Sequence, residues 1–252
     1  MTMGSVDTGD TGGTVPDEAG QNHEEPHGAG MAGRLNWLRA GVLGANDGIV
    51  STAGIVIGVA GATANRSVIL TAGIAGLAAG ALSMAVGEYV SVSTQRDTER
   101  ALLAKERREL HEMPDEELAE LTEIYVGKGL SPDVAALVAR QLTDHDALGA
   151  HAEAELGINP DELSSPWHAA FASLVAFTVG ALLPLLAIAL PPPVARVAVT
   201  VVAVALALVF TGAVAARLGH APWQRQVLRN VVGGLLAMGI TYGIGSLVGT
   251  TV

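Results

Sequence analysis

Residues 194–216 read VARVAVTVVAVALALVFTGAVAA, and Arg196 is the single charged residue among them. An α-helix rises about 1.5 Å per residue, so about 20 apolar residues cross a hydrocarbon core about 30 Å thick. Apolar runs of about 10 to 14 residues would instead suit the buried helices of a soluble protein. This longer stretch therefore predicts a transmembrane helix.

Four other apolar stretches are about as long. They cover residues 37–61, 68–92, 167–190 and 227–248. Of the 252 residues, 50% are hydrophobic and 15% are charged, whereas ordinary soluble domains carry about 25% charge. The sequence therefore predicts an all-α membrane protein with five transmembrane helices.

Acidic residues gather outside these stretches. Of the 25 Asp and Glu, 17 lie between Asp97 and Glu162 and 6 in the first 30 residues, which leaves Asp47 and Glu88 within predicted spans. The net charge of −11 argues against nucleic acid as a partner and favours cations. The chain has no cysteine, which excludes disulfides and thiolate sites, and it carries no catalytic triad, Walker loop or dinucleotide fingerprint.

The chain divides into four parts. Residues 1–33 are polar and acidic without Lys or Arg, which predicts a disordered tail rather than a signal peptide. His23 and His27 could loosely bind a metal there, although we interpret the tail as a solvated low-complexity segment. Residues 34–95 hold the first two spans, residues 96–165 form an acidic insert, and residues 166–252 hold the last three spans.

The basic residues predict the orientation. With the N-terminus in the cytosol, 12 of the 14 Lys and Arg lie in inside segments, and only Arg66 and Arg196 lie outside, as the positive-inside rule requires. Trp37, Trp167 and Trp223 also fall where spans would leave the cytosolic interface, at which indole rings prefer to lie. The insert is therefore predicted to be cytosolic and the C-terminus to be outside.

The insert is predicted to form three helices. The first continues the second span over residues 96–112, and Pro114 ends it before a second helix over residues 115–126. Ser131 and Pro132 have the pattern of an N-cap followed by Pro at the first helical position. They begin a third helix that ends near Leu156 and Gly157.

Asp47 and Met84 are predicted to lie at similar depth on adjacent antiparallel spans. Their distances from the cytosolic ends of these spans are roughly 14 Å and 12 Å at 1.5 Å per residue. A carboxylate at such depth costs at least about 2.5 kcal/mol, so Asp47 should face a cavity, a partner or a cation; the alternative is that residues 46–48 mark a helix break. Glu88 lies one turn nearer the cytosol on the face of Met84. Met84 is interpreted either as a packing residue or as a thioether ligand beside harder oxygen ligands.

Glutamates in the insert have the spacing of a second metal site. Glu106 and Glu109 are three residues apart on one predicted helix, as are Glu117 and Glu120 on the next, so a hairpin could turn all four carboxylates toward one another. The alternative is a solvated acidic face. On the third helix, His151 and Glu155 are four residues apart on one face, while Glu153 should point elsewhere.

Small residues recur in the spans at intervals of four, which lets helix backbones approach closely in lipid. These pairs are Gly54 and Gly58, Gly76 and Gly80, and Gly245 and Gly249. Contacts within one protomer and contacts in a dimer explain them equally well. Because five spans cannot form two equal inverted halves, a transport pathway on a dimer axis is attractive.

The chain resembles the vacuolar iron transporter family of ferrous-ion/proton antiporters. The resemblance covers nearly the whole chain after the tail and is carried by LGANDGIVST at residues 43–52, SMAVGEYVSV at residues 83–92 and the two glutamate pairs of the insert. It implies a homodimer with the pathway between protomers, lined by the first two spans, in which Asp47 and Met84 bind the transported ion. Glu88 belongs to the second of these motifs.

The resemblance also implies a cytosolic metal-binding domain that gathers divalent ions. Its ligand positions match Glu106, Glu109, Glu117, Glu120 and Glu155. His151 stands where the plant-type pattern has methionine, which makes the site harder and more sensitive to pH because imidazole titrates near neutrality. The Ala- and Gly-rich character of the chain indicates a bacterial plasma membrane rather than a vacuole.

The resulting hypothesis is proton-coupled export of Fe2+, and also of Mn2+, from the cytosol, with no permanently bound cofactor. Metal ions, protons, membrane lipid and a second copy of the chain are the expected partners. One alternative is a membrane-anchored metal sensor or storage scaffold without transport. A ferroxidase is disfavoured because the insert has no Glu-x-x-His pair.

Overall fold

A computed structural model describes residues 30–219 and 222–250, with side chains described from residue 41 onward. Residues 1–29 lie outside this range, and with them His23, His27 and most of the predicted tail. Seven helices and one π turn follow in chain order: α1 (Gly30–Ala62), α2 (Arg66–Glu112), α3 (Pro114–Gly127), α4 (Pro132–His151), η1 (Ala152–Leu156), α5 (Pro166–Ala189), α6 (Arg196–Leu218) and α7 (Trp223–Gly249).

Five of the helices are long and apolar enough to cross a membrane: α2, α5, α6, α7 and the part of α1 over Gly41–Ala62. Every regular element in the described part of the chain is helical. Large apolar side chains such as Leu186, Val202 and Phe210 are exposed, as expected for faces that contact lipid rather than water. The prediction of an all-α membrane protein with five transmembrane helices is confirmed.

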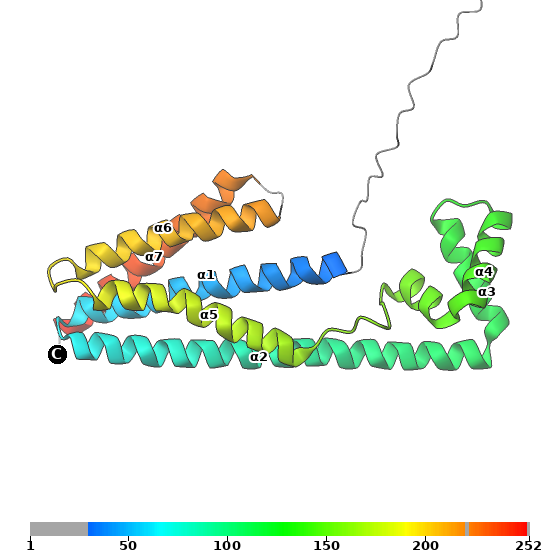
Figure 1. Cartoon of the computed structure of the whole chain (residues 1–252), viewed down its shortest axis with the longest axis horizontal. Coiled ribbons are helices and arrows are strands. Elements are labelled where there is room, and N and C mark those ends of the chain that lie inside the picture. Colours follow the sequence, from blue (N-terminus) through cyan, green and yellow to red (C-terminus); the bar gives the residue numbers. More distant parts are fainter. Residues whose placement is uncertain (1–29, 220–221, 251–252) are drawn as a thin grey trace, which may run out of the picture.

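α2 joins the transmembrane bundle to the insert. It has 47 residues without interruption and is therefore about 70 Å long at 1.5 Å per residue. Its first half packs beside α1 and α5, and its second half extends away from the bundle and carries α3 and α4 near its end (Figure 1). The helices predicted over residues 96–112, 115–126 and from Pro132 onward are all present.

The last helix of the insert is less regular than the sequence predicts. Asp146 has non-helical backbone angles (φ −156°, ψ 91°) inside α4, and its carboxylate accepts a 3.0 Å hydrogen bond from the Gly149 amide. η1 follows α4 directly and ends at Gly157, which adopts a left-handed conformation (φ 64°). A π turn holds more residues per turn than an α-helix and often lies at functional sites. His151 and Glu155 therefore do not share the face of a regular α-helix.

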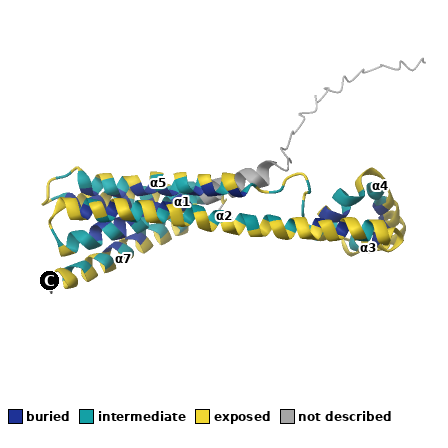
Figure 2. Cartoon of the chain, turned by 90° about the horizontal axis from the view of Figure 1, so that it is seen from below, coloured by how far each residue is buried: buried dark blue, intermediate teal, exposed yellow. Residues whose placement is uncertain are grey.

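α1 forms the centre of the transmembrane bundle. Its buried side chains Ile49 and Val56 belong to one apolar core. Ile188 of α5, Leu208 of α6 and Met238 of α7 complete that core. Figure 2 shows this arrangement as buried residues turned inward on the helices and exposed residues turned outward. The position of α1 at the centre fixes where its polar residues lie relative to the other spans.

Two glycines let α1 and α5 touch through their backbones. A Cβ atom at Gly48 would overlap the carbonyl oxygen of Phe177, and a Cβ atom at Gly180 would overlap that of Ala45. Because α1 runs through residues 46–48 without interruption, the alternative that these residues mark a helix break is wrong. Gly48 instead provides the space for the α1–α5 crossing.

The glycine pairs of the spans pack within one chain. An added Cβ atom at these positions would meet residues of a neighbouring helix within 4 Å. Gly54 and Gly58 face Thr241, Gly76 faces Ile55, Gly80 faces Phe177, Gly245 faces Gly58, and Gly249 faces Ala62. The structure thus assigns these pairs to contacts between helices of the same protomer.

At the opposite end of the bundle from the insert, an arginine joins two connections between spans. Arg196 at the start of α6 is buried, with 5% of its surface exposed. Its Nη1 donates a 3.2 Å hydrogen bond to the carbonyl oxygen of Ala64, in the connection between α1 and α2. This contact restrains that connection.

The contact between α1 and α7 gives a test of the packing. In Gly245→Ala the new Cβ atom would overlap the Gly58 carbonyl oxygen. Overpacking of this kind costs about 1 to 3 kcal/mol, more than the roughly 1 kcal/mol that alanine contributes to helix propensity. We expect a lower Tm in detergent, measured by size-exclusion chromatography after heating.

Gly243→Ala is the matched control on the same helix, because nothing lies within 4 Å of its added Cβ atom. We expect its Tm to equal or slightly exceed that of the wild type. Equal Tm values for the two variants would contradict a backbone contact between α1 and α7.

Candidate metal-binding sites

The first candidate site is a cavity between spans. It has a volume of about 500 Å³, and Asp47 of α1 and Met84 of α2 both line it. These are the two residues that the sequence predicts at similar depth on antiparallel helices. Asn46, Arg229 and Asn230 also line the cavity, so that its wall combines a carboxylate, a thioether, two amides and a guanidinium.

Asn46 is held by hydrogen bonds from two other spans. Its Oδ1 accepts a 3.1 Å hydrogen bond from Thr211 Oγ1 of α6 and a 3.2 Å bond from Asn230 Nδ2 of α7. Polar side chains between transmembrane helices stabilise the bundle by such bonds. This three-residue network fixes α1 against α6 and α7 directly beside Asp47.

Glu88 lies one turn from Met84 along α2 but does not line this cavity. Its neighbour Tyr89 contacts Trp167 in the first turn of α5, with 4.7 Å between ring centroids. Aromatic side chains of this kind concentrate at membrane interfaces. The contact therefore places Glu88 near the level at which α5 begins, about 6 Å along α2 from Met84 at 1.5 Å per residue.

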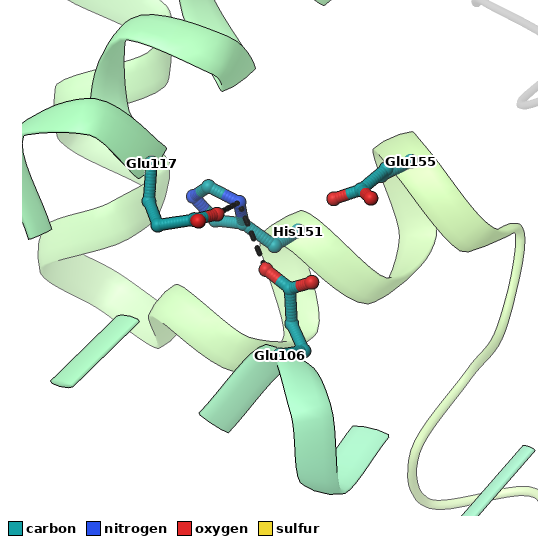
Figure 3. Close-up of side chains that lie close together, drawn as sticks. All are labelled: Glu106, Glu117, His151 and Glu155. Atoms are coloured by element: carbon teal, nitrogen blue, oxygen red, sulfur yellow. Dashed lines mark ion pairs between the residues drawn. The ribbon is translucent and has the colours of Figure 1, made fainter. Parts of the chain in front are cut away.

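The second candidate site lies in the insert, where four side chains converge (Figure 3). Glu106 of α2, Glu117 of α3, His151 of α4 and Glu155 of η1 each offer one ligand atom, and these four atoms all lie within 4.8 Å of one another. We call this group the carboxylate–histidine cluster. Glu106, Glu117 and His151 are buried, whereas Glu155 is exposed.

The His151 imidazole has no hydrogen-bond partner although it is fully buried. Its Nδ1 lies 3.2 Å from a Glu106 oxygen and 3.6 Å from a Glu117 oxygen, but neither ring nitrogen makes a hydrogen bond in the structure. Buried polar atoms without partners are rare and require an explanation. An ion placed about 2.1 Å from both Nδ1 and the Glu106 oxygen would have an N–ion–O angle of about 100°. The donor set therefore fits a divalent cation.

Burial and mutual repulsion change the protonation of the cluster. Burial, followed by the nearby charges of Glu155 and Glu117, raises the pKa of Glu106 to about 7. Burial likewise raises the pKa values of Glu117 and Glu155 and lowers the pKa of His151. The cluster without metal therefore favours protonated carboxyl groups and a neutral imidazole, and a bound cation would replace these protons.

Two of the predicted glutamates lie outside the cluster. Glu109 forms a 2.6 Å ion pair with Lys105 on the same helix, which raises the pKa of Lys105. Glu120 is exposed, and Glu153, as expected, is also exposed and outside the group. The structure thus brings together one glutamate from each predicted pair, while Glu109 is engaged by Lys105.

The sequence reasoning missed three residues of the first cavity. Asn46 is adjacent to Asp47 in the sequence, and Asn230 is a polar residue within an apolar stretch. Both could therefore have been predicted from the sequence as polar residues of a site between the spans. Arg229 was counted only among the charges that predict orientation. Its place beside Asp47 follows from the packing of α7 on α1, which the sequence pattern does not show.

The structure thus defines a membrane protein with two sets of potential metal ligands, one between the spans and one in a helical extension. Comparison with known proteins gives the family: the model described as VIT family matches residues 38–246. A vacuolar iron transporter of Acanthamoeba castellanii is 45% identical over 93% of this chain and 85% of its own length. Vacuolar iron transporter homolog 3 of Arabidopsis thaliana is 39% identical over 86% of each chain. The chain belongs to the VIT family.

The cluster should make the stability of the metal-free protein depend on pH. The folded-state pKa of Glu106, about 7, exceeds its unfolded value, so folding favours the proton. This contribution is complete below about pH 4.5 and is lost as pH rises through 7, by about 3 kcal/mol at 1.36 kcal/mol per pKa unit. His151 acts with the opposite sign below pH 6.5, because its pKa is lowered.

We expect Glu106→Gln to reduce the decrease in Tm that the wild type shows between pH 5 and pH 8 in the presence of a chelator, while Glu117 and Glu155, whose pKa values are also raised, retain the rest. The difference between the two Tm curves gives the contribution of Glu106. Glu153→Gln, at an exposed position on the same segment as Glu155, should follow the wild type. Parallel curves for wild type and Glu106→Gln would exclude the raised pKa.

Metal binding by the cluster can be tested with Mn2+, which is stable in air. All proteins carry Asp47→Asn, so that the cavity between the spans does not contribute. Mn2+ should raise the Tm, and His151→Ala should lose most of this shift, since a tenfold weaker affinity removes about 1.4 kcal/mol of stabilisation at saturating metal. His145→Ala, exposed on α4, is the control; an unchanged Mn2+ shift in His151→Ala would remove the imidazole from the ligand set.

Proposed function

We propose that this protein is a proton-coupled transporter that exports Fe2+, and also Mn2+, from the cytosol. The observation that carries the proposal is the cavity that Asp47 and Met84 line together from two different spans. An anchor that only held the insert would not need a carboxylate there, because a charge within a span costs at least about 2.5 kcal/mol. The names of the relatives support iron as the ion.

The ligand chemistry of the cavity suits a divalent ion of intermediate hardness. The Asp47 carboxylate is a hard oxygen donor, which favours Fe2+ and Mn2+, and the Met84 thioether accepts softer ions as well. The neighbouring amides of Asn46 and Asn230 add polar groups to the same wall. The cavity therefore accommodates a partly dehydrated transition-metal ion.

The carboxylate–histidine cluster is proposed to collect the ion before transport. It lies in the predicted cytosolic insert, and Glu106 is about 27 Å from Glu88 along α2 at 1.5 Å per residue. An ion released from the cluster would meet Glu88 near the membrane interface and then the cavity one turn deeper. In this proposal α2 carries the gathering site, the entrance and one wall of the transport site on a single helix.

Proton coupling is proposed to use the same carboxylates that bind the metal. Cation binding requires them to be ionised, and departure of the cation allows them to take up protons. A proton gradient directed into the cytosol would then favour release of the metal outside and return of protons inside. A homodimer with the pathway between protomers would supply ligands from both copies of α1 and α2.

The proposed location is a plasma membrane with the N-terminus and the insert in the cytosol. The distribution of basic residues supports this orientation. The compared relatives are named as vacuolar proteins, whereas the Ala- and Gly-rich composition supports a bacterial plasma membrane. In both membranes the transporter would remove the metal from the cytosol.

A metal sensor or storage scaffold is the second candidate function, and one observation favours it. All four ligands of the cluster come from the insert and its α2 extension, so the cluster needs no residue from the bundle to hold a metal. A sensor would bind Fe2+ in the insert but would move none across the membrane. Transport and binding must therefore be measured separately.

Asp47→Asn distinguishes these functions. Proteoliposomes with an acidic interior and a metal-quenched internal dye should show rapid Fe2+ uptake with the wild type, under reducing conditions. The isosteric variant should lose at least about 90% of the uptake rate, because removal of a charged ligand costs more than the 1.4 kcal/mol that corresponds to a factor of ten. Mn2+ serves as the second test ion.

Asp133→Asn, an exposed carboxylate in the first turn of α4, controls for the loss of a negative charge and should transport normally. Expression and Mn2+ binding by the insert should be unchanged in Asp47→Asn. Normal uptake by Asp47→Asn would overturn the assignment of the cavity. Absence of Fe2+ and Mn2+ uptake by the wild type would favour the sensor.

A further inference from the structure

Arg229 places a positive charge in the cavity that is proposed to carry cations. Among the described residues that line it, Asp47 and Arg229 are the only charged ones, and both are exposed. The guanidinium remains protonated at all physiological pH values. A fixed cation repels an incoming metal ion, so its presence in a metal pathway requires an explanation.

The packing of α1 on α7 places the two charged residues in the wall of the same cavity. Asn46 accepts a hydrogen bond of 3.2 Å from Asn230, and one turn further a Cβ atom on Gly234 would lie 3.7 Å from Val50. Asp47 and Arg229 are the immediate neighbours of the two hydrogen-bonded asparagines.

The surroundings leave Asp47 as the natural counter-ion of Arg229. Asp47 supplies the only carboxylate among the described residues of the cavity wall. Across the residues described, no ion pair within 4 Å engages Arg229, and this includes Asp47, so pairing of the two requires the guanidinium to turn toward the carboxylate. Charged groups within spans face a cavity and pair with one another, because lipid cannot solvate them. The side chain of arginine is long and flexible enough to turn toward a carboxylate on the adjacent helix.

We propose that Arg229 is an internal counter-cation for Asp47: it neutralises the carboxylate while the cavity is empty, and an entering metal dication displaces it. The inference rests on the proposed function of the cavity and adds a specificity-determining residue to it. Binding then exchanges one cation for another at Asp47, so Arg229 sets the metal concentration at which the cavity fills.

The exchange also makes the cavity selective for divalent over monovalent cations. A monovalent cation such as K+ carries no more charge than the guanidinium and lacks its paired hydrogen bonds to a carboxylate. A divalent metal carries twice the charge and adds the Met84 thioether as a ligand, so it can displace Arg229 where K+ cannot. Arg229 would thus exclude the abundant monovalent ions of the cytosol.

The first test measures Mn2+ transport in proteoliposomes of zwitterionic lipid for wild type, Arg229→Lys and Arg229→Gln. Loss of the fixed charge should lower the KM of Arg229→Gln for Mn2+ by about tenfold, since a unit charge a few ångströms away acts strongly at an effective dielectric constant of about 20. K+ at high concentration should inhibit Arg229→Gln but not the wild type. Arg229→Lys, which keeps the charge, should remain close to the wild type in both respects.

An unchanged KM and no K+ inhibition in Arg229→Gln would overturn the proposal. Equal effects of the Lys and Gln substitutions would also overturn it, because they would indicate a structural role independent of charge. If Arg229→Gln differs from the wild type only in vesicles that contain anionic lipid, then Arg229 binds a lipid phosphate, and the counter-cation role is wrong.

A double-mutant cycle tests the pair without transport. Asp47→Asn and Arg229→Gln each leave one charge of the pair without its partner, so each should lower the Tm of the metal-free protein. The double variant should be more stable than the sum of the single effects predicts, and additive effects would exclude the pair. Because this readout is independent of uptake, a wild type that moves no metal would refute the proposed function and leave the pairing to be decided by the cycle.

Discussion

The backbone contact between α1 and α5 at Gly48 and Gly180 is the constraint on which the membrane part depends. Because neither position has a Cβ atom, a carbonyl group of the opposite helix packs directly against the backbone of each glycine. Lipid offers no hydrophobic driving force between helices, so such close packing must hold the spans together. The contact lies directly beside Asp47 and fixes the part of α1 that carries it.

The position of α1 at the centre then determines which spans can reach the cavity. α5 packs against the Gly48 side of α1, while α6 and α7 donate hydrogen bonds to Asn46. Asp47 lies between these two contacts in the sequence and lines the space beside Met84 of α2. The backbone at Asp47 is therefore held by packing at Gly48 and by the hydrogen bonds of Asn46, which is the support that a precise ligand position needs.

The fold and part of each site could be predicted from the sequence. Five apolar stretches and two prolines were sufficient for the helices, because span length and helix breaks depend on local composition. The similar depths of Asp47 and Met84 were predicted from helix rise alone. The selection of Glu106 and Glu117 over Glu109 and Glu120 did not, because it depends on how α3 folds back on α2 and on the Lys105–Glu109 ion pair. The kink at Asp146 and the π turn, which direct His151 and Glu155, had no clear signal in the helical pattern.

The two sites meet the same electrostatic difficulty by different means. A set of ligands for a dication is strongly charged when it is empty, and burial makes that charge costly. The carboxylate–histidine cluster lies outside the spans and can take up protons, which is why the pKa of Glu106 rises to about 7. In our proposal the cavity between the spans has the fixed charge of Arg229 in addition to a carboxylate that can take up a proton.

This difference has a consequence for the order of events. A site neutralised by protons responds to the pH of the solution around it, and its affinity for metal rises as the protons leave. A site neutralised by a tethered guanidinium has a constant internal competitor whose concentration does not change with pH. The cluster would therefore adjust metal collection to cytosolic conditions, while the cavity would keep the same preference for divalent ions. Separation of the two tasks along α2 allows each site to keep the charge balance that suits it.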